Sequence, residues 1–220
     1  MLNWLSRIRR NGLSRTDDPD VRSLAQMRAD LATDPSEFPI RDLRPVLIPT
    51  EILSVGNWVG PFHRFESLPV SLAWAYLRPS QTMMYLSTQL ASALEVRGID
   101  WRRDSRSSLR QDFERAPWTH QFGAEGEEIQ AVALLHPDGL GPSRLLCYDG
   151  LLRRFPSGFT FFVPERSSAL VLSKTASEKI RGSVQRAVQG CLKAAAVPMS
   201  ANEFDCAVLY EALTEVDGCA

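Results

Sequence analysis

The sequence of 220 residues has few of the features that mark several protein classes. It contains four cysteines, three lysines and three histidines, and its formal net charge is −1. No apolar stretch reaches the roughly 18 to 20 residues that a membrane-spanning helix needs. A charge near zero provides no long-range attraction for nucleic acids or anionic lipids. These absences exclude a transmembrane protein and a strongly basic nucleic-acid binder.

The cysteines are too sparse to crosslink a chain of this length, and no two of them form a C-x-x-C pair. They are Cys147, Cys191, Cys206 and Cys219. We expect free thiols, which suit a reducing compartment. Arginines within residues 7–10 interrupt the first segment before an export signal can form. The sequence therefore predicts a cytoplasmic protein.

Motifs for metal binding and nucleophilic catalysis are also missing. The three histidines, His63, His120 and His136, are 57 and 16 residues apart and form no H-x-x-x-H pair. Cys147 and His136 are the nearest cysteine and histidine, but the hairpin predicted below separates them by roughly 16 Å. We therefore expect no metal, no cofactor and no catalytic residue.

The composition is that of a globular protein, with 44% hydrophobic and 23% charged residues. We predict three parts: a basic amphipathic tip at residues 1–14, a mixed α+β lobe at 15–116, and a lobe of antiparallel sheet and helix at 117–220. Two interpretations of the tip stay open, contact with a membrane interface and docking on the protein body. No stable membrane anchor is expected, and the oligomeric state is left open.

In the first lobe, prolines bound a short apolar strand at 45–49, and a second apolar strand spans 68–77. Helical periodicity and capping residues predict helices at 17–33, at 81–97 after a Ser80 cap, and at 105–114.

The second lobe has a clearer pattern. Residues 129–135 and 143–148 predict one antiparallel hairpin, and 159–163 with 169–172 predict another. Residues 177–196 carry a single apolar stripe at helical spacing, which must cover a sheet. Residues 200–214 fit a helix and a strand equally well. The fold class predicted is α+β, with a C-terminal antiparallel β-meander covered by one long amphipathic helix.

Three segments of this lobe resemble a bacterial α+β family that is described only as a domain of unknown function. Asp138-Gly-Leu-Gly-Pro-Ser-Arg144 is similar to the family's D-G-x-x-x-x-R strand, Val163-Pro-Glu-Arg-Ser167 to its V-P-x-x-D turn, and Val197-Pro-Met-Ser200 to its V-P-x-S exit. Ser167 departs from the family's aspartate, so a contact made by that acid does not carry over. The resemblance implies a two-lobed α+β fold and no established reaction.

A non-catalytic protein-interaction or regulatory module is the function that we expect, with a protein as partner. The turn at 165–168 projects from a hairpin, where binding loops are commonly placed. The candidate interaction residues are Glu165, Arg166, Ser167, Asp138 and Arg144.

Two alternatives are kept. One is a hydrolase or transferase with an unusual site, which needs a pocket holding a carboxylate or histidine of shifted pKa. The other is nucleic-acid binding by the arginine-rich stretch 97–115, through Arg102, Arg103, Arg106 and Arg110. Nucleic acid is not the favoured partner, because Asp100, Asp104, Asp112 and Glu114 lie in the same stretch and nearly cancel its charge.

Overall fold

The computed structural model describes residues 39–54, 58–77, 83–123 and 129–217. These residues form two compact units. The N-terminal unit contains the described residues of 39–65 and 70–112, and the C-terminal unit contains those of 66–69 and 113–217. The basic tip, the helix predicted at 17–33, Ser80 and Cys219 lie outside the described residues.

The N-terminal unit is built on an antiparallel sheet with β3 (Val70–Leu77) at its centre. β1 (Leu43–Pro49) pairs with one edge of β3, while β2 (Phe62–Arg64) and β4 (Met83–Tyr85) pair with the other. β3 is buried along nearly its whole length, as its mostly apolar and aromatic residues favour. The strands predicted at 45–49 and 68–77 are therefore confirmed as β1 and β3.

Two helices follow this sheet, α3 (Thr88–Val96) and α4 (Trp101–Arg115). The Ser87 hydroxyl accepts a hydrogen bond from the backbone N–H of Leu90 at 3.1 Å and caps α3. The helix predicted at 81–97 is wrong in its first turns, because Met83–Tyr85 pair with β3 instead. The helix predicted at 105–114 is confirmed and begins four residues earlier.

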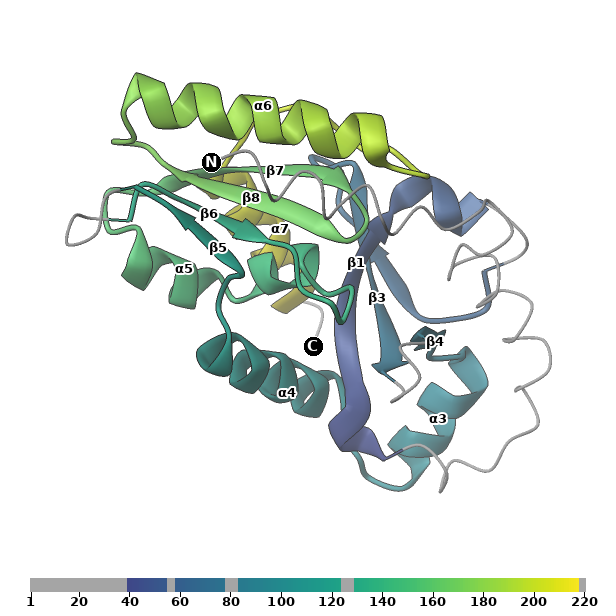
Figure 1. Ribbon diagram of the computed structural model, residues 1–220. Coiled ribbons are helices and arrows are strands. Elements are labelled where there is room, and N and C mark those ends of the chain that lie inside the picture. Colours follow the sequence, from purple (N-terminus) through teal and green to yellow (C-terminus); the bar gives the residue numbers. More distant parts are fainter. Residues whose placement is uncertain (1–38, 55–57, 78–82, 124–128, 218–220) are drawn as a thin grey trace. The chain divides into compact units, whose positions relative to one another are not determined.

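The C-terminal unit contains a five-stranded antiparallel sheet with the order β5-β6-β8-β7-β9 (Figure 1). Its strands are β5 (His120–Phe122), β6 (Ala131–Leu134), β7 (Phe159–Glu165), β8 (Ser168–Ser173) and β9 (Phe204–Asp205). The hairpin predicted at 159–163 and 169–172 is confirmed as β7 and β8. In β6 and β8 every residue is buried, which leaves both strands inaccessible from either face.

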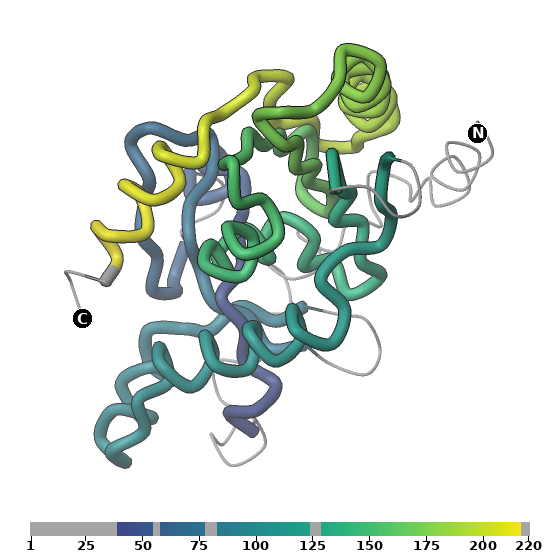
Figure 2. The backbone as a smooth tube through the Cα atoms, turned by 90° about the vertical axis from the view of Figure 1, so that its left-hand side faces the viewer, coloured from purple at the N-terminus to yellow at the C-terminus, as the bar shows by residue number. Residues whose placement is uncertain are grey.

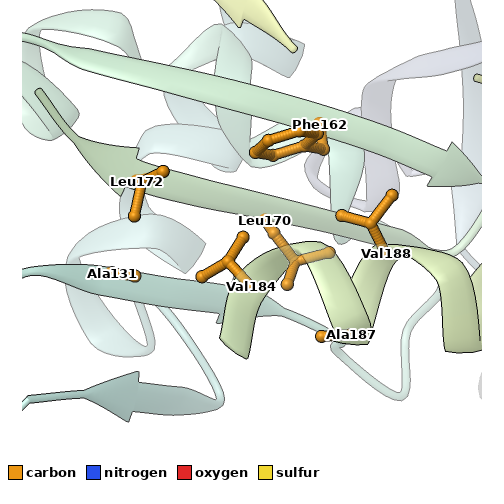
Figure 3. Packing of buried hydrophobic residues seen from close by; sticks show 7 residues of the cluster. All are labelled: Ala131, Phe162, Leu170, Leu172, Val184, Ala187 and Val188. Carbon is orange, nitrogen blue, oxygen red and sulfur yellow. The ribbon is translucent and has the colours of Figure 1, made fainter. Parts of the chain in front are cut away.

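The helix α6 (Glu178–Ala194) lies along one face of this sheet, and Figure 2 views it almost along its axis. Figure 3 shows its valines Val184 and Val188 packed against Phe162, Leu170 and Leu172 of β7 and β8. Burying a side chain of this size contributes about 1.5 to 3 kcal/mol. These contacts confirm the predicted α+β fold, with an antiparallel sheet under one long amphipathic helix.

The opposite face of the sheet is covered by α5 (Tyr148–Arg154) and α7 (Cys206–Asp217). The Tyr148 ring lies 5.9 Å from the ring of Phe159 in β7 and 5.6 Å from the ring of Tyr210 in α7. Because side chains alternate along a strand, Phe159 and Phe162 pack on opposite faces of β7. Residues 200–214, which fit both patterns in sequence, are a two-residue strand followed by a helix.

The hairpin predicted between 129–135 and 143–148 is wrong. Both edges of β6 are already paired, with β5 on one side and β8 on the other. Residues Pro142–Leu146 instead form a 3-10 turn, and α5 begins at Tyr148. Pro142 has no N–H to donate to a sheet ladder and has a backbone angle that suits the start of a helical turn.

Among the residues that the structure describes, no helix has both the length and the apolar character needed to cross a bilayer.

Candidate functional site

Asp138 and Arg144 form a two-pronged ion pair in the segment between β6 and α5. The two guanidinium NH groups of Arg144 donate to Asp138 Oδ1 and Oδ2 at 3.2 and 2.9 Å, and the Leu140 backbone N–H donates to Oδ1 at 2.8 Å. The Arg144 side chain is only 3% exposed, and that of Asp138 is 32% exposed. Burial opposes ionisation of Asp138, but the hydrogen bonds from Arg144 and Leu140 outweigh it and lower its pKa. Arg144 therefore holds the loop in place from inside.

His136 lies beside this ion pair and is buried. Its ring Nε2 donates to the backbone carbonyl of Ala116 at 2.9 Å, whereas Nδ1 has no hydrogen-bond partner among the described residues. Burial, and then the charge of Arg144, lower the pKa of His136, so the ring is neutral at pH 7. Since neither ring nitrogen bonds a thiol, the structure places no Cys147–His136 pair at this loop.

The stability of the protein is expected to fall as the pH drops through the titration range of histidine. The pKa of His136 is lowered from 6.5 in the folded state, so the unfolded chain binds a proton first on acidification. The contribution of the neutral ring is complete above pH 6.5 and is lost progressively below it. Urea denaturation from pH 8 down to 5 measures this loss as a falling midpoint.

His136→Gln tests the assignment, because glutamine keeps an N–H for the Ala116 carbonyl and does not titrate. We expect this variant to flatten the pH dependence, while His120→Gln, at an exposed histidine, leaves it unchanged. An equally steep decline in His136→Gln would show that another group is responsible.

The second segment that contains predicted interaction residues is the turn between β7 and β8. Glu165 Oε1 accepts hydrogen bonds from the Ser167 hydroxyl at 2.7 Å and from the Ser168 hydroxyl. Ser167 is exposed, and Glu165 and Arg166 are half-buried. Burial and the charge of Glu165 raise the pKa of the Cys191 thiol beneath the turn to about 11, so that cysteine is a structural group.

The two segments meet at Gly141. A Cβ atom at this position would lie 2.1 Å from the carbonyl oxygen of Leu134 and 2.5 Å from that of Ser167. Only glycine allows so close an approach of the backbones. We refer to residues 136–144 and 165–168 as the loop pair. It contains the five interaction residues predicted from sequence: Asp138, Arg144, Glu165, Arg166 and Ser167. The prediction is wrong for Arg144 as a contact residue, because its side chain is buried and bound to Asp138.

A third stretch of chain, residues 197–199, borders the loop pair. Glu165 forms an isolated β-bridge with Pro198, and the Met199 N–H donates to the Pro164 carbonyl at 2.9 Å. Val197, next to the bridge, is 37% exposed and places an apolar side chain beside polar ones.

The four arginines predicted as a nucleic-acid surface all lie on α4, in the N-terminal unit. Arg102 contacts Glu95 at 3.0 Å and its guanidinium lies 4.0 Å from the centre of the Trp101 ring. Arg103 and Arg110 are exposed, and Arg106 is half-buried. They share one helix face, as described below.

One polar cluster was not predicted from the sequence. Lys174 Nζ lies 2.8 Å from Asp205 Oδ2, and Asp205 Oδ1 accepts the N–H of Ala207 at 2.9 Å, which caps α7. The hydrogen bond from Ala207, together with that from Lys174, lowers the pKa of Asp205. Burial and the adjacent Cys206 raise the pKa of Tyr148. The ion pair links the start of α7 to Lys174, the residue that follows β8.

Within the described ranges, no group of three or more histidine, cysteine or acidic side chains has the arrangement of a metal site. No family model matches the chain, and neither the curated proteins nor the solved structures contain a match.

Proposed function

We propose that this protein is a non-catalytic cytoplasmic module that binds another protein through the loop pair. The observation that carries the proposal is the close backbone contact at Gly141, which holds two loops distant in sequence next to each other. Both loops also resemble segments of one bacterial family, which supports a shared role for them.

Rigidity of the loop pair supports this function. Ordering a flexible loop on binding costs free energy, and a loop already held in one conformation avoids most of that cost. The ion pair between Asp138 and the buried Arg144 holds the first loop, and Glu165 holds both serines of the second.

The chemistry of the surface also suits a protein partner. Asp138, Glu165 and Arg166 present charges of both signs, Ser167 presents a hydroxyl, and Val197 adds exposed apolar area. Mixed polar and apolar groups are typical of protein interfaces, whereas a phosphate site needs an excess of donors and positive charge.

Site-specific crosslinking tests the proposal. Ser167 is replaced by a photo-crosslinking amino acid, the tagged protein is illuminated in a lysate of its native organism, and adducts are identified by mass spectrometry. Position 185 on the exposed face of α6 serves as the matched control. We expect one protein to crosslink from position 167 and not from position 185.

The same partner must then respond to a change in the surface. Ser167→Arg places a long cation in the interface and is expected to weaken the interaction by roughly tenfold, or about 1.4 kcal/mol. Equal crosslinking from both positions, or binding that is unchanged in Ser167→Arg, would contradict the proposal.

A further inference from the structure

We propose that the arginine face of α4 is a second binding surface, and that its ligand is the phosphate backbone of a nucleic acid. This inference concerns the N-terminal unit and does not depend on the loop pair. It is carried by the position of the arginines on the helix and by the partners of the nearby acids.

The arginines occupy one side of α4. Arg102, Arg106 and Arg110 follow one another at intervals of four residues, and Arg103 lies next to them, so all four fall within an arc of about 100°. Arg102, Arg103 and Arg110 are exposed. About 12 Å separates Arg102 from Arg110 along the axis, a length over which one strand of a duplex offers three or four phosphates.

Two of the four acids that nearly cancel this charge in sequence are paired with arginines outside the face. Asp112 Oδ2 lies 2.6 Å from Arg44 Nε, with its side chain 20% exposed. Glu114 Oε1 accepts a hydrogen bond from Arg153 at 2.9 Å. The other two remain near the face: the Asp100 carboxylate accepts the backbone N–H of Arg103 at the start of the helix, and Asp104 is exposed. Because Glu95 pairs with Arg102 at 3.0 Å, the net positive charge of the face comes mainly from Arg103 and Arg110.

Two other anionic partners, a membrane surface and an acidic protein, fit this face less well. A helix that binds a membrane surface needs an apolar stripe exposed beside its cations. The apolar residues Trp101, Leu109 and Phe113 are instead buried. A protein interface needs an apolar centre, whereas the exposed neighbours of the arginines are polar or charged, namely Asp104, Ser107 and Gln111. A face that offers guanidinium groups without apolar area suits phosphates, which these groups bind through paired N–H donors.

Fluorescence anisotropy of the full-length protein with labelled oligonucleotides tests the inference. Single-stranded DNA, single-stranded RNA and duplex DNA of mixed sequence are titrated between about 50 and 200 mM salt. We expect binding at the lower salt concentration that weakens as salt rises. Arg103→Glu/Arg110→Glu is expected to reduce affinity by roughly tenfold or more and to lower the salt slope by about 2.

The matched control is Arg186→Glu/Lys193→Glu, which makes the same change in charge at exposed positions of α6. It is expected to retain most of the affinity. Arg103→Gln/Arg110→Gln, a milder change, keeps the test valid if the glutamate variant fails to fold, as judged by its urea midpoint.

Three results would overturn the inference. They are the absence of salt-dependent binding to all three nucleic acids, an equal loss of affinity in the α6 control, and tighter binding to polyglutamate or to phosphatidylserine vesicles than to any oligonucleotide. Each would show that the arginine face does not recognise a nucleic-acid backbone.

Discussion

Asp138→Ala is expected to lower the free energy of unfolding by about 3 kcal/mol. The substitution removes the carboxylate that both guanidinium NH groups of Arg144 contact. The arginine side chain, 3% exposed, would then be a buried cation without its counter-charge. Urea denaturation followed by circular dichroism measures the loss.

The double variant Asp138→Ala/Arg144→Met separates the loss of the contact itself from the cost of leaving a buried arginine without its counter-charge. Methionine fills much of the arginine's volume and needs no partner, so the double variant is expected to come within about 1 kcal/mol of the wild type. Asp149→Ala, at an exposed acid on α5, is the control and should cost about 0.5 kcal/mol or less. Equal losses in the single and double variants would mean that the stranded charge is not the cause.

Gly141→Ala is expected to destabilise the protein by about 3 kcal/mol, at the upper end for overpacking. The backbone at Gly141 has φ −48° and ψ −63°, which alanine adopts freely. The whole cost therefore comes from the two carbonyl oxygens that the new methyl group would meet, and neither belongs to a movable side chain.

Gly182→Ala is the matched control for this substitution. Gly182 is inside α6, and the nearest atom to its Cβ position is the Arg186 guanidinium at 3.6 Å. Alanine there is expected to stabilise the protein by about 0.5 to 1 kcal/mol, because it favours the helix. If both substitutions were neutral or stabilising, the loop pair would not be packed as described.

The elements that depend on local pattern were predicted well from the sequence. The apolar stripe of α6 and the hairpin of β7 and β8 both follow from spacing within one short segment. Residues 143–148 also have a strand-like pattern, yet the edges of β6 are taken by β5 and β8, which lie elsewhere in the chain. Competition between distant segments for one edge is not visible in a local window.

In the candidate sites, too, local features were predicted from the sequence and long-range contacts were not. Asp138 and Arg144 were identified in sequence, but the burial of Arg144 depends on the loop around it. The pairing of Asp112 with Arg44 spans 68 residues, so a count of neighbouring charges missed it. A usable signal was overlooked for α7, where Asp205 precedes a buried helical stripe of Cys206, Leu209, Ala212 and Val216.

The strand order has a consequence for synthesis on the ribosome. β6 is made more than thirty residues before its neighbour β8, and the chain between them contributes α5 and β7. Until β8 emerges, one row of β6 amide and carbonyl groups has no partner, and its apolar faces are uncovered. The nascent chain therefore passes through a stage in which β6 is vulnerable to pairing with other polypeptides, and completion of β8 ends that exposure.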